Sequence, residues 1–256
     1  MNLTTDNYFS KEMQAKYMSV SQFKAFEKCQ AAAMAEITGE YEPQMTISLL
    51  VGSYVDAYFD NSIGEFKAKY PKIFRQTDGV LKSDYRHANE IIQRIERDKL
   101  FMEFLSGEKQ VIMTGELEGV PIKIKIDALH PDKIVDLKIV KDFAPMYVPE
   151  QGRVSFIEGW RYDLQGAVYQ EIVRQNTGKA LPFYIAAATK EAVPDIDIIE
   201  IPQELLAYEL GKFKEKLKLY DYIKKGVVEP ERCERCDYCK ATKQLTSPKS
   251  LEEFSE

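Results

Sequence analysis

The chain has 256 residues, of which 45% are hydrophobic and 30% are charged, and its formal net charge is −6. This composition allows a full hydrophobic core, and the absence of a proline- or glycine-rich linker fits one large domain better than two small ones. The negative net charge argues against a protein that coats nucleic acid nonspecifically. It does not exclude a protein in which basic residues line a channel locally.

The hydrophobic pattern predicts helices in the first hundred residues. They are Val20 to about Ile37, Ile47 to Phe59, and a third that is capped by Ser83 and runs through Leu100. Ser19 and Gln22 form a capping-box pattern at the start of the first helix, which would carry Cys29 in its middle.

After Gly107 the spacing of hydrophobic residues changes to every second residue. It predicts an antiparallel meander of strands at Val111 to Thr114, Val120 to Ala128 and Lys133 to Val140. Helical spacing returns from Trp160 to Arg174, with Trp160 on the apolar face. Two strands and a last helix follow at Leu181 to Ala188, Ile196 to Ile201 and Gln203 to Lys225. We expect one α/β domain, residues 1–256, with a central mixed sheet flanked by helices.

The strand before residue 140 presents an acid and a lysine on one face. Side chains alternate along a strand, so Asp136 and Lys138 point away from the apolar residues beside them. Asp127 ends the preceding strand and lies across a short turn, where it adds a second carboxylate. An acid and a lysine two residues apart are most often a solvated strand face. The preceding acid favours a site here.

These residue types suit the hydrolysis of a phosphodiester. Two carboxylates bind a hard divalent cation such as Mg²⁺ through oxygen, and Mn²⁺ accepts the same ligands. A lysine beside them can orient or deprotonate the attacking water. The carbonyl of Leu137, between the two side chains, is a further candidate ligand.

In this order the motifs resemble those of the PD-(D/E)xK nuclease superfamily, in its branch of RecE-type phage exonucleases and RecB-like nucleases. The resemblance rests on Asp127, on the run from Asp136 to Lys138, and on a Q-x-x-x-Y element formed by Gln165 and Tyr169. It extends from about residue 17 to the last cysteine. It implies a restriction-endonuclease-like core and a metal-dependent nuclease activity.

The resemblance also implies roles for the helix that follows these strands. Gln165 and Tyr169 are four residues apart and share a helix face, and Arg161 lies on the same side. In the family this face borders the active site, where Gln165 and Tyr169 complete the catalytic set and Arg161 is a candidate DNA contact. The alternative is a half-buried helix face without a catalytic role.

Further candidates each have a structural alternative. The family often places a histidine in a Gly-x-x-x-His element, and the segment starting at Gly52 places Asp56 there, as a metal ligand or as a polar helix residue. Glu116, at a strand end, is either another metal ligand or a solvated turn residue. Lys190, which follows a strand, is either a phosphate contact or a solvent-facing lysine.

The chain has four cysteines, Cys29 and the C-x-x-C-x-x-C run of Cys233, Cys236 and Cys239. No secretion signal or membrane-spanning stretch is recognisable, so we expect a cytoplasmic protein without a membrane partner, in which clustered thiols bind metal. Related RecB-like nucleases hold a [4Fe–4S] cluster with one cysteine before the core and three after it, and the resemblance implies the same here. A structural Zn²⁺ site and reduced thiols without metal are the alternatives.

By resemblance, we expect an exonuclease that resects double-stranded DNA ends in phage-type homologous recombination. The family further implies a single-strand annealing protein as partner and a homo-oligomer around DNA. One alternative is an enzyme like the CRISPR-associated RecB-family nucleases, which process DNA ends or fragments. Another is a noncatalytic DNA-binding or scaffold protein that retains the fold, against which Asp127, Asp136 and Lys138 argue.

Overall fold

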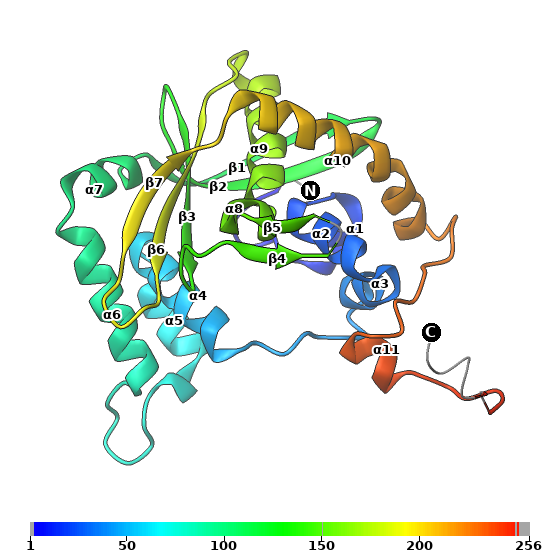
Figure 1. Ribbon diagram of the computed structural model, residues 1–256, viewed down its shortest axis with the longest axis horizontal. Coiled ribbons are helices and arrows are strands. Elements are labelled where there is room, and N and C mark those ends of the chain that lie inside the picture. Colours follow the sequence, from blue (N-terminus) through cyan, green and yellow to red (C-terminus); the bar gives the residue numbers. More distant parts are fainter. Residues whose placement is uncertain (1–2, 150, 249, 251–256) are drawn as a thin grey trace.

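A five-stranded mixed sheet forms the centre of the computed structural model, which describes residues 3–149, 151–248 and 250 (Figure 1). In sheet order the strands are β1 (Glu108–Leu117), β2 (Val120–Leu129), β3 (Ile134–Val140), β6 (Phe183–Thr189) and β7 (Ile196–Glu200). Strands β3 and β6 are parallel, and the other neighbours are antiparallel. The predicted domain bounds of 1–256 and the predicted cysteine-rich tail of 229–256 include residues outside this description.

Helices cover both faces of the sheet (Figure 1). One face packs against α2 (Val20–Lys28), α9 (Tyr162–Thr177) and α10 (Gln203–Lys224). The other packs against α4 (Ile47–Phe59), α5 (Ile63–Lys69), α6 (Ser83–Glu96) and α7 (Lys99–Leu105). Successive side chains of a strand point to opposite faces, so Ile134 enters the first core and Val135 the second. The expected central mixed sheet flanked by helices is confirmed.

Smaller elements connect or extend these layers. They are α1 (Lys11–Lys16), α3 (Gln30–Thr38), a 3-10 turn at Pro71–Ile73, a hairpin of β4 (Met146–Val148) and β5 (Gly152–Val154), α8 (Phe156–Gly159) and α11 (Asp237–Ala241). Helices α3 and α11 lie side by side at one end of the molecule (Figure 1). In the described part of the chain, no helix is both long enough and apolar enough to cross a membrane.

Several elements lie where the pattern predicts them. Helix α4 has the predicted bounds, and β1, β2 and β3 form the predicted antiparallel meander. Glu118 and Gly119 make the first turn with φ values of 50° and 79°, the left-handed conformation of a two-residue hairpin turn. Helix α10 begins at Gln203 as predicted and ends one residue early, at Lys224.

The predicted helix from Val20 to Ile37 is wrong, because Cys29 interrupts it. Cys29 has an extended backbone, with φ −166° and ψ 111°, between α2 and α3. Next to the interruption, the amide of Ala31 donates to the carbonyl of Glu231 at 3.0 Å, in the segment that leads to the other cysteines. The break therefore lies where the chain meets its own C-terminal segment.

Two other helix predictions are wrong at their ends. The helix predicted from Ser83 stops before Asp98, whose side chain accepts a hydrogen bond from the amide of Phe101 and caps a separate helix, α7. The helix predicted from Trp160 starts two residues later, because Arg161 has a left-handed φ of 55°. Trp160 is consequently 50% exposed rather than on the apolar face.

The depth of α9 over the sheet depends on Gly166. A Cβ added at Gly166 would lie 2.5 Å from Cδ1 of Phe183, which is fully buried on β6. Helix α9 also carries Gln165 and Tyr169. The absence of a side chain at Gly166 therefore lets two predicted site residues approach the strands closely.

We predict that Gly166→Ala lowers the free energy of unfolding by about 1–3 kcal/mol, because the methyl group overpacks the helix–sheet contact. Gly211→Ala is the matched control, since Gly211 is an exposed residue inside α10 with no atom within 4 Å of the added Cβ. It should stabilise the protein by about 0.5–1 kcal/mol through helix propensity. Urea unfolding of both variants measures the difference, and equal effects would contradict the proposed contact.

Candidate active site

Strands β2 and β3 separate where the predicted site residues lie. Their pairing ends at Ala128 opposite Val135. Beyond that pair the amide of Leu137 donates to Oδ2 of Asp127 at 3.0 Å, so the carboxylate takes the hydrogen bond that a longer strand pair would make. The amide and carbonyl of one residue lie on the same edge of a strand, so the carbonyl of Leu137 also faces this gap.

Asp136 is held from two sides. It is 2% exposed, and its Oδ1 accepts a hydrogen bond from Nε2 of Gln165 at 2.6 Å. Its Oδ2 lies 2.5 Å from Nζ of Lys138. This second contact is an ion pair without hydrogen-bond alignment, and Oδ2 has no hydrogen-bond donor among the described residues. One oxygen is thus fixed by an amide, and the other faces the charged centre of the site.

Lys138 is a buried cation in this arrangement. Burial lowers the pKa of Lys138, but the charges of Asp136 and Asp127 outweigh that effect and raise the pKa above its ordinary value. Its Nζ also lies 5.2 Å from the ring centroid of Tyr162. Lys138 therefore stays protonated and acts as a fixed positive charge beside two carboxylates.

Tyr169 and Gln165 hold α9 over the gap between the strands. The hydroxyl of Tyr169 donates to the carbonyl of Lys125 on β2 at 3.0 Å, two residues before Asp127. Gln165 contacts β3 through Asp136. The Q-x-x-x-Y element thus joins one helix face to both strands that carry the acids.

Helix α4 adds a third carboxylate, that of the half-buried Asp56. Its Oδ1 is buried without a hydrogen-bond donor among the described residues. Burial raises the pKa of Asp56 to about 7, with smaller effects from Lys138, which lowers it, and from Asp60 and Asp136, which raise it. Burial and Asp136 likewise raise the pKa of Asp127. Clustered carboxylates with raised pKa values and buried, unpaired oxygen atoms fit a divalent cation, whose charge offsets theirs.

Gln110 is a site residue that the sequence pattern did not indicate. It lies on β1 opposite Asp127, between the register pairs Lys109–Ala128 and Val111–Ile126, and has a left-handed φ of 55°. Its Nε2 donates to Oδ1 of Asp127 at 3.5 Å, and its side chain also hydrogen-bonds Asp60. Nothing in the alternation of β1 marks a residue with a left-handed backbone here, so the sequence carries no signal for it.

The two residues predicted to contact DNA, Arg161 and Lys190, bind other parts of the protein. The guanidinium of Arg161 bridges Glu27 on α2 at 3.0 Å and Glu209 on α10 at 2.9 Å. Nζ of Lys190 donates to the carbonyl and the hydroxyl of Ser48, both at 2.9 Å, near the start of α4. In this structure both side chains therefore connect elements of the fold.

Glu116 lies away from the other predicted ligands. It is exposed near the β1–β2 turn, and its backbone exchanges hydrogen bonds with the side chain of Gln175. Gln175 is ten residues after Gln165 on α9, which corresponds to about 15 Å along a helix. The structure does not bring Glu116 to the site.

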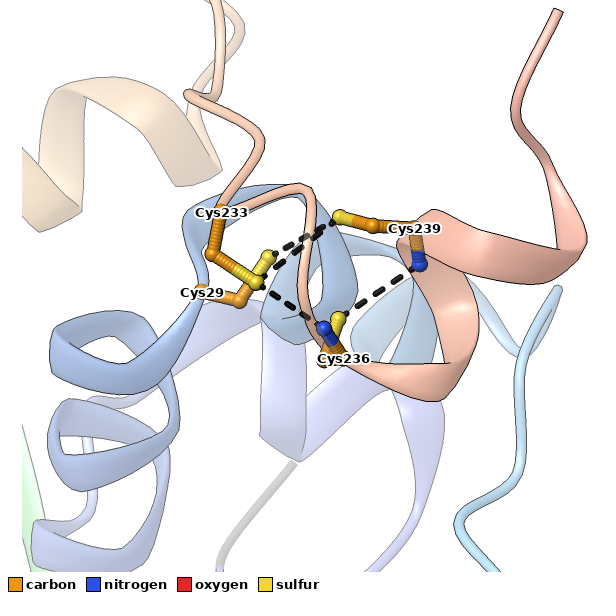
Figure 2. A group of neighbouring side chains, drawn as sticks. All are labelled: Cys29, Cys233, Cys236 and Cys239. Carbon is orange, nitrogen blue, oxygen red and sulfur yellow. Dashed lines mark hydrogen bonds between the residues drawn. The ribbon is translucent and has the colours of Figure 1, made fainter. Parts of the chain in front are cut away.

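The four cysteines form a separate site between α3 and α11 (Figure 2). Cys29 lies at the break between α2 and α3, and Cys233, Cys236 and Cys239 come from the C-terminal segment. All four sulfur atoms lie within 4.8 Å of one another, and those of Cys29 and Cys239 are 3.6 Å apart. Among the described residues, no other group of histidine, cysteine or acidic side chains places three ligand atoms so close together.

Backbone amides of the C-terminal segment favour a thiolate at Cys233. The amides of Arg235 and Cys236 donate to its sulfur, and these hydrogen bonds lower the pKa of Cys233 to about 6. The amide of Cys239 also donates to Sγ of Cys236 at 3.5 Å, but burial outweighs this bond and raises the pKa of Cys236. Because the thiolate is the metal-binding form, this arrangement fits a bound metal.

We predict that Asp56→Asn stabilises the metal-free protein at pH 8 but not near pH 4. Asp56 ionises near 3.8 in the unfolded chain and near 7 in the folded one, so the folded state binds more protons between these values and loses stability as the pH rises. The gain at pH 8 is at most about 4 kcal/mol. Urea unfolding in EDTA across this range measures it. The exposed Asp6→Asn is the control, and an Asp56→Asn effect independent of pH would contradict the prediction.

Comparisons with known proteins agree with this geometry. A family model described as "PDDEXK-like domain of unknown function (DUF3799)" matches residues 19–242. The crystal structure of a protein from Eubacterium rectale, described as a "putative exonuclease", is 46% identical in sequence and superposes with a TM-score of 0.96, covering 100% of this chain and 98% of that one. No curated protein matches the chain.

Proposed function

The chain belongs to the PDDEXK-like family, within the PD-(D/E)xK nuclease superfamily, and on that premise we propose that it is a divalent-metal-dependent exodeoxyribonuclease that degrades linear duplex DNA from its ends. The placement of Asp127, Asp136 and Lys138 around the gap between β2 and β3 carries this proposal. The description of the 46% identical protein as an exonuclease supports action at ends.

Asp127, Asp136 and the carbonyl of Leu137 would hold Mg²⁺ or Mn²⁺, with Asp56 as a further ligand from α4. The donor set is all oxygen, as these hard cations require. The metal would supply an activated water and offset negative charge on the phosphate. Because Oδ1 of Asp136 is bonded to Gln165, its other oxygen is the one presented to the cation.

Lys138 would act on the attacking water and on the phosphate as a positive charge. Its raised pKa means that it donates hydrogen bonds rather than accepts a proton. Its ammonium group is fixed by Asp136 on one side and by the ring of Tyr162 on the other. Tyr169 supports this geometry from a distance, through the backbone of β2.

We predict that Lys138→Ala lowers the rate of Mg²⁺- or Mn²⁺-dependent degradation of linear duplex DNA roughly 100- to 10,000-fold. An assay with end-labelled linear DNA, with closed circular DNA alongside it, measures the rate and the requirement for ends. Lys99→Ala, an exposed change on α7, is the control. Turnover by Lys138→Ala at the control rate would remove the catalytic assignment, and cleavage of the circle would remove the exonuclease assignment.

The biological setting that we propose is end resection in phage-type homologous recombination in the cytoplasm. The resemblance of the motifs to RecE-type exonucleases supports it. A single-strand annealing partner and a homo-oligomer around DNA belong to the same proposal. An enzyme of the CRISPR-associated type would instead process single-stranded ends or short fragments, so strand polarity and the preference for duplex DNA distinguish the two.

For the cysteine site we propose a single tetrahedral ion, with Zn²⁺ as the usual partner of four thiolates. A Zn–S distance of about 2.3 Å places the sulfurs of a tetrahedron about 3.8 Å apart. The sulfur of Cys239 lies 3.6 Å from that of Cys29 and 3.9 Å from that of Cys233. In a four-iron cluster each thiolate binds its own iron, so the sulfurs lie further apart. The spacing supports zinc over the [4Fe–4S] cluster expected from the resemblance.

We predict that anaerobically purified protein contains about one zinc per chain, and that Cys236→Ser loses it and melts several degrees lower, because the site joins distant segments. Metal analysis and a thermal melt measure both effects. Lys240→Ala, a neighbouring exposed change, should keep the zinc. Stoichiometric iron and sulfide in the wild-type protein would establish the cluster instead.

A further inference from the structure

Helix α2 places a second lysine beside the active site. Nζ of Lys24 donates to the carbonyl of Trp160 at 3.0 Å and lies 5.5 Å from the ring centroid of Tyr162. Lys138 contacts the same ring at 5.2 Å. The two ammonium groups therefore flank one aromatic side chain, and Lys24 extends the positive charge of the site toward α2.

The charge of Lys24 is not neutralised by a contact. Among the described residues no carboxylate lies within ion-pair distance of its Nζ, and the carbonyl of Trp160 accepts only one of its three N–H groups. Burial and the charge of Lys138 lower the pKa of Lys24 to about 7, while Asp136 and Asp163 oppose this change. Lys24 is half-buried, and its remaining N–H donors are free to bind an anionic partner.

Lys24 opens onto a groove that leads toward the cysteine site. Lys24 and Lys28, one turn apart on α2, both line this groove, whose volume is about 440 Å³. Tyr41 lines it too, and its ring packs against Tyr238 with centroids 5.4 Å apart. The groove also reaches Cys236. It thus runs along α2 between Lys24 and the cysteines.

The dimensions and chemistry of this groove suit one strand of DNA. A volume of this order accommodates small-molecule ligands, so the groove has room for one or two nucleotides of a single strand. Positive charges along a groove with an aromatic ring are the usual features of single-strand binding, since phosphates contact the lysines and bases stack on the ring. Glu36 also lines the groove, and its negative charge opposes phosphate binding. Burial raises the pKa of the Glu36 carboxyl group, and the charge of Lys28 lowers it.

We propose that the groove along α2 binds the single-stranded end of the DNA substrate, with backbone phosphates on Lys24 and Lys28 and a base against Tyr41. The inference rests on the proposed nuclease function, because it assigns the path by which a strand reaches Lys138. It makes Lys24 and Lys28 determinants of strand binding, separate from the residues that perform the hydrolysis.

The test measures binding without cleavage, by the anisotropy of a labelled single-stranded oligonucleotide and a blunt hairpin duplex in EDTA. Lys24→Gln and Lys28→Gln should each weaken single-strand binding about 5- to 20-fold and reduce the slope of log K against log salt by about 0.7. Lys24→Arg should retain binding, and Glu36→Gln should tighten it severalfold. Lys99→Ala is the control for loss of an exposed charge.

Two further results decide the interpretation. Thermal melts of Lys24→Gln and Lys24→Arg show whether the bond to Trp160 is needed for folding, and a loss of affinity only in variants that melt early would overturn the proposal. Wild-type affinity and salt slope in both glutamine variants would also overturn it. If the wild-type protein cleaves no DNA, the proposed function fails while the binding comparison still tests the groove.

Discussion

The separation of β2 from β3 determines the geometry of the active site. Two paired strands would satisfy their own backbone groups, but here the pairing stops and Asp127 satisfies the amide of Leu137 instead. The same gap leaves the carbonyl of Leu137 facing the carboxylates. Helix α9 then covers the gap, with Gln165 bonded to one strand and Tyr169 to the other. Asp127 is therefore positioned by a backbone amide, and Asp136 by the side chain of Gln165.

This geometry concentrates charge that the fold alone does not neutralise. Asp56, Asp127 and Asp136 lie near an ion-paired lysine, Lys138, and the pKa values of Asp56 and Asp127 rise because of burial and of the charge of Asp136. A buried carboxylate is stable only with a partner, so the site is incomplete as protein. The nearby ion pairs of Arg161 differ, because they join α2, α9 and α10 without unpaired charge.

The catalytic strands could be predicted because their signal is local. Alternation places Asp136 and Lys138 on one face, and helical spacing places Gln165 and Tyr169 on another, whatever the rest of the chain does. The left-handed backbone at Gln110 could not be predicted, since such a conformation inside a strand is set by its tertiary neighbours. The same reason explains why the pattern did not indicate Lys24 and why the predicted helices wrongly continued through Cys29 and Asp98. Their roles arise from contacts with Trp160, with a helix start and with a segment about two hundred residues away.

That last contact has a consequence for how the protein is made. The sulfurs of Cys29 and Cys239 meet across 210 residues, and α2 packs against α10, which also comes late in the chain. During synthesis α2 emerges early, before α10 and the C-terminal cysteines that it contacts in the folded protein. A ribosome that stops early, even after Asp127, Asp136 and Lys138 are made, releases a chain whose α2 lacks its late contacts. A chain that stops soon after Lys138 therefore has one of the four cysteines and no α10, so the contacts that hold α2 are incomplete.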